Sequence, residues 1–168
     1  MPGQGQETMD RRALVVGFGN PLMGDDGVGL AVLEALRKVD LPPQVRLAEG
    51  GTDATSLASL WEGEEVVVLL DALALGGTPG SVTVLDRLAL RELATAQPHV
   101  HALALPACLE WVCLAQPALA AAQVYLVGVE PATVAPTHAL SPQVVAAVPQ
   151  AVRQVLELVS GARAGTGA

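Results

Sequence analysis

Hydrophobic residues in this chain form short uninterrupted runs that alternate with stripes of helical spacing. Uninterrupted aliphatic runs are typical of strands that are buried on both faces, as in a parallel sheet. The predicted strands of this kind are 12–17, 45–48, 65–70 and 123–127. Helical spacing predicts helices that follow them, at about 25–39, 54–61, 88–94, 106–114 and 142–160. The alternation of strand and helix predicts an α/β fold.

Residues 81–85 form one further predicted strand with a different orientation. Only residues 71–80, which end in the glycine-rich segment 76–80, separate it from the strand at 65–70, and this connection is too short for a helical crossover. We therefore expect an antiparallel edge strand. The predicted fold is a three-layer α/β/α sandwich with a mostly parallel sheet of about five strands. We expect one domain over 1–168, flexible tails at 1–11 and 161–168, and a kink or break of the last helix at Pro149.

The composition narrows the classes of protein to which the chain can belong. Hydrophobic residues make up 51% of it and aromatic residues only 2%, so the core is expected to be aliphatic. The formal net charge is −8 and the basic residues are scattered, which argues against a nucleic-acid partner. No apolar run approaches the roughly 20 residues of a membrane helix, and residues 1–12 lack an apolar signal segment. We expect a cytoplasmic protein with no membrane association.

Neither a serine nor a cysteine nucleophile is indicated. The sequence contains no GxSxG or HExxH motif. Cys108 and Cys113 lie five residues apart on a predicted helix, with no paired base identifiable in the sequence, and we interpret them as small buried apolar residues.

Three segments bring polar side chains to the carboxyl ends of predicted strands, where ligands of open α/β sheets bind. They are GFGNPLMGDDGVG at 17–29, Asp71 directly after the strand 65–70, and His101 within HALALPACL. Together with EGGT at 49–52 and LVGVEP at 126–131, these segments resemble the hydrogenase maturation endopeptidases. The resemblance spans about 13–158, and the long glycine-asparagine and acidic motif is its most specific part.

The resemblance implies that Asp26, Asp71 and His101 contact a metal and perform catalysis, and that Gly50, Gly51 and Thr52 contact the substrate. It also implies a function, namely removal of the carboxyl-terminal extension from the precursor of a nickel-iron hydrogenase large subunit. The nickel is expected to be recognised in the substrate, with no tightly bound organic cofactor. Two carboxylates and an imidazole are acceptable ligands for nickel. Whether the metal polarises the scissile carbonyl or a carboxylate acts as general base stays open.

Simpler interpretations of these residues remain. Asp25 and Asp26 could cap the following helix, and Asp71 could bond a neighbouring loop. His99 is a second candidate for the imidazole, whereas His138 is expected in a loop. The segment 50–52 could be only a turn between strand and helix.

Two other functions are also compatible with parts of the sequence. The first glycine turn and Glu49 imitate a dinucleotide-binding Rossmann layout, although Leu22 replaces the third glycine and two carboxylates disfavour a pyrophosphate. A non-catalytic metalloprotein chaperone that uses the same acidic edge is the other alternative.

Overall fold

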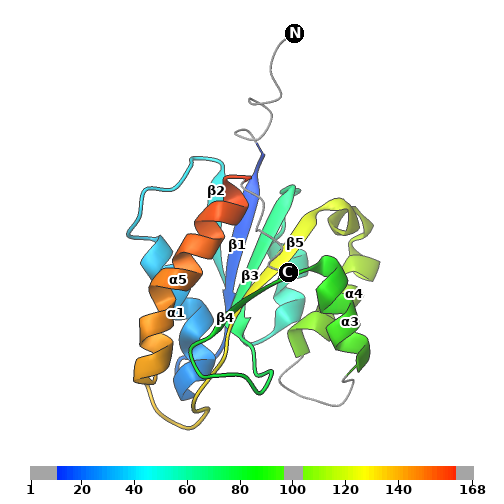
Figure 1. Ribbon diagram of the computed structural model, residues 1–168. Helices are drawn as coiled ribbons and strands as arrows, with labels where there is room; N and C mark the ends of the chain where they lie inside the picture. The colour runs from blue at the N-terminus through cyan, green and yellow to red at the C-terminus, as the bar shows by residue number, and fades with distance from the viewer. Residues whose placement is uncertain (1–10, 97–103, 162–168) are drawn as a thin grey trace, which may run out of the picture.

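A computed structural model of the chain describes residues 11–96 and 104–161. Its centre is a five-stranded sheet in the order β2-β1-β3-β5-β4 (Figure 1). The strands are β1 Ala13–Phe18, β2 Val45–Gly51, β3 Val66–Ala72, β4 Val82–Asp86 and β5 Gln123–Val129. All neighbouring pairs are parallel except β4 and β5, which are antiparallel. The predicted mixed sheet with one antiparallel edge strand is confirmed.

Helices cover both faces of the sheet, which confirms the three-layer sandwich. The α-helices are α1 Val28–Leu36, α2 Leu57–Leu60, α3 Arg87–Ala96, α4 Ala104–Ala115 and α5 Pro142–Val159. The short 3-10 helices are η1 Gly24–Gly27, η2 Ala54–Ser56 and η4 Pro117–Ala121. Figure 1 shows α1 and α5 side by side on one face, with α3 and α4 on the other.

Two aliphatic cores, one on each face of the sheet, explain the uninterrupted hydrophobic runs. In β1, Val15 packs with α1 and α5, whereas Leu14 and Val16 pack on the opposite face with α2 and α4. Successive side chains of a strand point to opposite faces, so a strand covered on both sides must be apolar at every position.

Several boundaries differ from those that the sequence predicts. β2 continues through the EGG segment to Gly51, and β3 continues to Ala72, because both strands keep their pairing with a neighbour to the end. α5 is a single helix that contains Pro149 and is not split by it. Its buried stripe includes Ala147 and Ala151, whereas Val145 is exposed.

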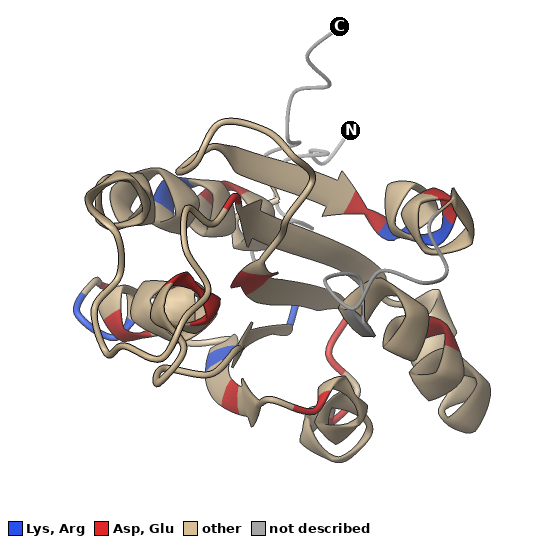
Figure 2. Cartoon of the chain, turned by 90° about the horizontal axis from the view of Figure 1, so that it is seen from below, with Lys and Arg blue, Asp and Glu red and all other residues tan. Residues whose placement is uncertain are grey.

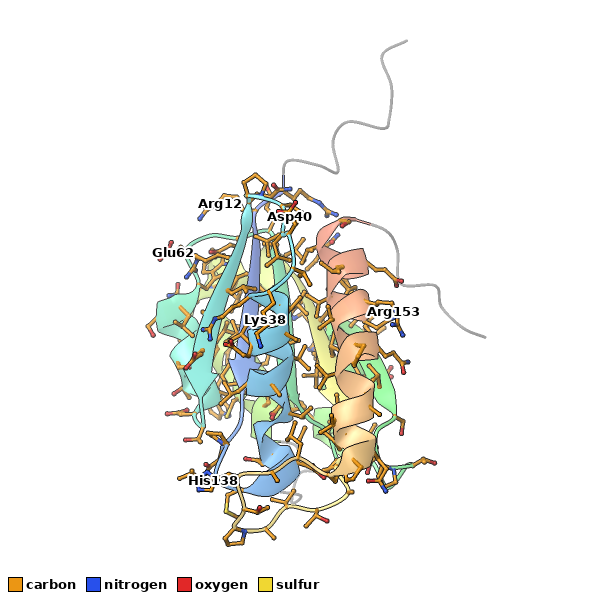
Figure 3. All side chains as sticks on the ribbon, turned by 90° about the vertical axis from the view of Figure 1, so that its left-hand side faces the viewer. Arg12, Lys38, Asp40, Glu62, His138 and Arg153 are labelled. Carbon is orange, nitrogen blue, oxygen red and sulfur yellow. The ribbon has the colours of Figure 1, made fainter. Side chains whose placement is uncertain are left out.

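The amino end of the sheet contains an ion pair whose acidic partner is buried. Glu64 is only 1% exposed and accepts hydrogen bonds from Nε (2.9 Å) and Nη2 (2.7 Å) of Arg46 and from the backbone N–H of Glu62. Figure 3 shows Arg12 and Glu62 at this end of the molecule and His138, a loop residue as expected, at the opposite end.

None of the helices in the described residues is long and apolar enough to cross a membrane. The expected flexible tails lie almost entirely outside the described residues. They stay predictions, as does the single domain.

Candidate functional site

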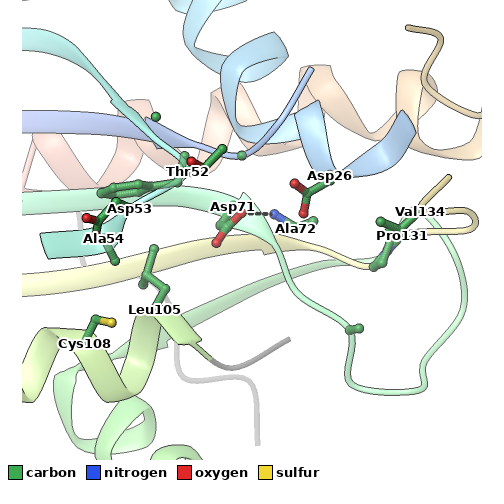
Figure 4. Close-up of a pocket in the computed structure, with 14 residues that line it drawn as sticks. Asp26, Thr52, Asp53, Ala54, Asp71, Ala72, Leu105, Cys108, Pro131 and Val134 are labelled. Atoms are coloured by element: carbon green, nitrogen blue, oxygen red, sulfur yellow. Dashed lines mark hydrogen bonds between the residues drawn. The ribbon is translucent and has the colours of Figure 1, made fainter. Parts of the chain in front are cut away.

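A ligand-sized cavity lies at the carboxyl ends of β1 and β3. The connection that leaves β1 leads through α1 to β2 on one side, whereas β3 pairs with β1 on its other side. In open α/β sheets such a reversal leaves a crevice in which ligands bind. A cavity of about 330 Å³ opens here (Figure 4). It is lined by Phe18, Gly19, Asp26, Gly51, Thr52, Asp53, Ala54, Asp71, Ala72, Ala74, Leu105, Cys108, Pro131 and Val134.

Two glycines allow the segment with Asp26 to approach the sheet. Gly19 has φ +126°, and a Cβ atom there would lie 1.9 Å from the carbonyl oxygen of Asp26. A Cβ atom on Gly29 would lie 2.3 Å from the carbonyl oxygen of Phe18 and 2.4 Å from that of Leu70. Only glycine permits both approaches. The first turn of α1 is therefore held against the ends of β1 and β3.

Asp26 lies in η1 and faces the cavity with a half-buried side chain. Its Oδ2 atom accepts a hydrogen bond from the backbone N–H of Asn20 at 2.9 Å. The side chain of Asn20 in turn accepts from the N–H of Leu22, also at 2.9 Å. The glycine-asparagine turn of the motif therefore fixes the orientation of the Asp26 carboxylate.

Asp71 is the second carboxylate in the cavity, near the end of β3 and paired in register with Gly128 of β5. Burial raises the pKa of Asp71 to about 7, although the N–H of Ala72, 2.8 Å from Oδ1, favours the ionised form. The negative charge of Asp26 raises the pKa of Asp71 further, which shows that the two carboxylates are close enough to interact. Figure 4 shows both side chains in the same part of the cavity.

A third carboxylate gives the cavity a strongly acidic character. Asp53 accepts hydrogen bonds from Oγ1 (2.7 Å) and N–H (2.9 Å) of Thr55, which lower the pKa of Asp53. Among the described residues that line the cavity there is no lysine or arginine. Figure 2 looks onto this end of the molecule, with acidic residues in red. Such a cavity suits a cation and disfavours a phosphate.

Asp25 does not cap the helix that follows it, contrary to one interpretation of the sequence. Its side chain is fully buried and bonds a loop more than a hundred residues further along the chain. Burial favours the protonated form of Asp25, but hydrogen bonds from Ser141, Thr133 and Ala132 outweigh this effect and lower its pKa. Ser141 precedes α5, but its hydroxyl group donates to Asp25 and does not cap α5.

The predicted substrate segment is only partly exposed to the cavity. Gly51 and Thr52 line it, and the Cβ position of Gly51 meets open space. Gly50 is buried beneath the ring of Phe18, where a Cβ atom would lie 2.2 Å from a ring carbon, and it does not line the cavity. Glu49, the acidic residue of the alternative dinucleotide-binding layout, forms an ion pair with Arg37 at 2.8 Å.

His101 and His99 lie outside the described residues. Leu105 and Cys108, in the first half of α4, line the cavity, so the chain enters α4 beside it. Within 11–96 and 104–161, no three His, Cys, Asp or Glu side chains are placed to hold a metal ion. The structure brings Asp26 and Asp71 together in one cavity, and metal contact by Asp26, Asp71 and His101 stays a prediction.

Several of the residues that line the cavity were not predicted from the sequence. Asp53 could have been found from the Asp-x-Thr pattern of a capped turn, and Pro131 from the proline-containing loop after β5. Val134 and Cys108 give no signal in the sequence, because their approach to the cavity depends on the tertiary fold.

The fold and this site define a class: a three-layer α/β protein with an acidic cavity at the switch point of its sheet. Residues 30–158 match the HycI family, described as hydrogenase maturation protease. The hydrogenase 2 maturation protease of Escherichia coli is 31% identical over 147 residues, which are 86% of this chain and 88% of that protein. The chain belongs to the hydrogenase maturation protease family, and the prediction that it is a hydrolase of the peptidase class is confirmed.

Two further comparisons agree. The solved structure of the [NiFe] hydrogenase maturation protease HybD from Thermococcus kodakarensis has a TM-score of 0.73 and 27% identity, over 88% of this chain and 99% of that one. The hydrogenase expression/formation protein HupD of Rhodobacter capsulatus is 37% identical over 75 residues. That match spans 44% of this chain and only 36% of HupD.

Proposed function

We propose that this protein is an endopeptidase that removes the carboxyl-terminal extension of a nickel-iron hydrogenase large-subunit precursor after nickel insertion. One observation supports the proposal above all others: Asp26 from η1 and Asp71 from the end of β3 line one acidic cavity. The Thermococcus kodakarensis relative is a [NiFe] hydrogenase maturation protease, which supports the choice of substrate.

The substrate itself presents the metal in this proposal. Carboxylate oxygens of Asp26 and Asp71 and an imidazole nitrogen of His101 contact the nickel of the precursor, a mixed ligand set that nickel accepts. A cavity of about 330 Å³ is at the small end of the range for ligand pockets and has room for a metal with part of a peptide. Asp26, Asp71 and His101 contact the nickel only after it has been inserted into the precursor, so the tail is not cleaved before nickel insertion.

The peptide passes along the side of the cavity formed by the end of β2. Gly51 has φ +68° and open space at its Cβ position, so an extended chain can approach its backbone closely. Thr52 adds a hydroxyl group at the same rim. Gly50 contributes indirectly, because its lack of a side chain allows the Phe18 ring to pack beneath this rim.

Two hydrolytic routes are compatible with this arrangement. The nickel can polarise the scissile carbonyl, or a carboxylate can remove a proton from the attacking water while the metal serves for recognition. A cytoplasmic location and the absence of a tightly bound organic cofactor stay predictions.

The test is co-expression with a nickel-iron hydrogenase large-subunit precursor, followed by mass spectrometry of the large subunit. We expect the wild-type protein to yield a shortened subunit only when nickel is supplied. Asp26→Asn and Asp71→Asn should leave the precursor at full length, whereas Asp40→Asn, an exposed acid at the opposite end of the molecule, should process normally. A stable complex whose precursor keeps its full mass would instead establish the chaperone alternative.

A further inference from the structure

One wall of the cavity is a loop without regular secondary structure. It follows β5 from Pro131 to Leu140, and Pro131 and Val134 on it line the cavity (Figure 4). A loop of this length has many accessible conformations, so a fixed wall requires contacts that hold it in place. Three backbone hydrogen bonds join this loop to residues 22–25 of the glycine-asparagine motif and help to hold it in place. They run from Gly24 N–H to Thr137 O (2.8 Å), from Asp25 N–H to Thr133 O (3.0 Å) and from Thr137 N–H to Leu22 O (3.0 Å).

The Asp25 carboxylate holds both ends of this loop. Oδ2 accepts hydrogen bonds from the backbone N–H groups of Ala132 and Thr133, each at 2.8 Å, near the start of the loop. At its end, the N–H of Ser141 donates to Oδ1 at 2.7 Å and the hydroxyl of Ser141 donates to Oδ2 at 2.8 Å. The Asp25 side chain therefore fixes the position of the loop relative to Asp26, the next residue in the chain.

The charge state of Asp25 matters for this contact. The side chain is 0% exposed, and no lysine or arginine of the described residues forms an ion pair with it. A buried carboxylate without a cation is costly unless hydrogen-bond donors surround it, and here four donors do so. Asparagine cannot replace it, because its NH₂ group would face N–H donors at one end of the loop.

We propose that Asp25 is a positioning residue for the substrate: it holds the wall of Pro131 and Val134 at the distance from Asp26 that the precursor peptide requires. The proposal rests on the proposed function and assigns separate roles to the two adjacent acids of the motif. Asp26 faces the reacting groups, whereas Asp25 acts through the loop. Because the Asn20 N–H orients Asp26 independently, loss of Asp25 affects binding of the peptide more than the chemical step.

The experiment compares Asp25→Asn and Ser141→Ala with Glu64→Gln. Glu64 is an equally buried, hydrogen-bonded carboxylate at the opposite end of the sheet. Processing of purified nickel-loaded precursor is measured well below the melting temperature of each variant. We expect KM to rise about tenfold in Asp25→Asn and about threefold in Ser141→Ala, with kcat within about twofold of wild type. Glu64→Gln should change neither constant.

Amide hydrogen exchange of the free protein provides a second readout that needs no substrate. The amides of Ala132, Thr133 and Ser141 should exchange faster in Asp25→Asn and Ser141→Ala and at the wild-type rate in Glu64→Gln. If Asp25→Asn does not fold, Ser141→Ala tests both readouts alone.

The outcomes separate the two proposals. A wild-type protein that leaves the precursor intact contradicts the proposed function, whatever the exchange rates are. Normal wild-type processing together with an unchanged KM in the loop variants, a defect confined to kcat, or unchanged loop exchange overturns the role of Asp25 alone.

Discussion

Asp71 shows how a position in a sheet changes the chemistry of one carboxyl group. It follows five buried residues of β3, so desolvation disfavours its ionised form. An aspartate in this place destabilises the free protein at neutral pH. Proteins commonly retain residues that bind a ligand even though these residues lower the stability of the free protein.

The stability of the metal-free protein should therefore depend on Asp71 and on pH. The pKa of Asp71 is about 7 in the folded protein and near the ordinary value of 3.8 in the unfolded chain. The folded state retains a proton that the unfolded state loses, so the free energy of unfolding falls as the pH rises from about 4 to about 7. The full effect is on the order of 4 kcal/mol. Asp71→Asn should remove it.

Urea denaturation with a chelator present, at pH 5 and at pH 8, checks this prediction. The variant should be more stable than wild type, and its advantage should be larger at pH 8. An advantage that shrinks as the pH rises would contradict the raised pKa of Asp71.

His101 belongs to the proposed site by resemblance and precedes the lining residue Leu105 by four positions in the sequence. We expect His101→Ala to abolish processing and to leave the circular dichroism spectrum and the melting temperature almost unchanged, because a metal contact on a substrate adds little to the stability of the free enzyme. His99→Ala is the matched control and should process normally. Full activity of His101→Ala would exclude this histidine from the mechanism.

The predicted strand ends place the glycine-asparagine motif and Asp71 at the same edge of the sheet, and the resemblance singles out Asp26 within that motif. The sequence could not predict the partners of Asp25. Ser141 is 116 residues away, and no local pattern relates the two. The sequence also did not reveal that Gly50 packs on Phe18, since only the pairing of β2 with β1, which shifts register between Gly17 and Phe18, brings them together.

Among the secondary-structure elements, helix α1 must lie close to the sheet for Asp26 to reach the cavity. Gly29→Ala would force backbone atoms of β1, β3 or α1 to move, and we expect a loss of about 3 kcal/mol in the free energy of unfolding. Activity should fall as well, because η1 and α1 position Asp26. Gly77→Ala is the control, since its nearest contacts at 3.6 Å are ordinary.

Chemical denaturation and processing assays measure both effects. Gly77→Ala should stay within about 0.5 kcal/mol of wild type. Equal stability of the two variants would show that the helix can move away from the sheet without strain.

Helix α5 includes an exposed proline, and its replacement should stabilise the protein. Pro149 provides no N–H for the carbonyl of Val145. Its side chain is exposed, so Pro149→Ala loses little packing. We expect a gain of about 1–3 kcal/mol, seen as a higher melting temperature. A lower melting temperature would mean that the proline ring stabilises α5 through contacts that outweigh the missing hydrogen bond.

Uninterrupted aliphatic runs predicted the parallel strands well, because double burial requires that composition. The neighbour of β4 was not predictable in the same way. β4 follows β3 directly in the chain but pairs with β5, which arrives only after α3 and α4. Strand order depends on which strands pair in space, and hydrophobic periodicity contains no such information.

Over the whole molecule, one ion pair and the proposed functional site lie at opposite ends of the sheet. The buried Glu64 pairs with the half-buried Arg46 at the amino end, whereas the acidic cavity lies at the carboxyl end. Arg46→Ala leaves Glu64 without its main cationic partner and should cost about 3 kcal/mol. The kcat/KM of the folded fraction should not change.

Arg37→Ala serves as the control, because within the described part of the chain Arg37 forms ion pairs only with the exposed residues Glu34 and Glu49. It should cost less than about 1 kcal/mol. A loss of kcat/KM in Arg46→Ala at a temperature where the variant is fully folded would show that the two ends are coupled.

The natural cysteines also differ in their access to the cavity. Cys108 is half-buried and lines it, whereas Cys113 is 7% exposed and packs in the core. A thiol-reactive fluorophore should therefore label Cys108 first, within reach of any peptide that enters. A fluorophore attached to Cys108 of the unmodified sequence would therefore report when a precursor tail enters or leaves the cavity, and stopped-flow fluorescence could follow both events in real time.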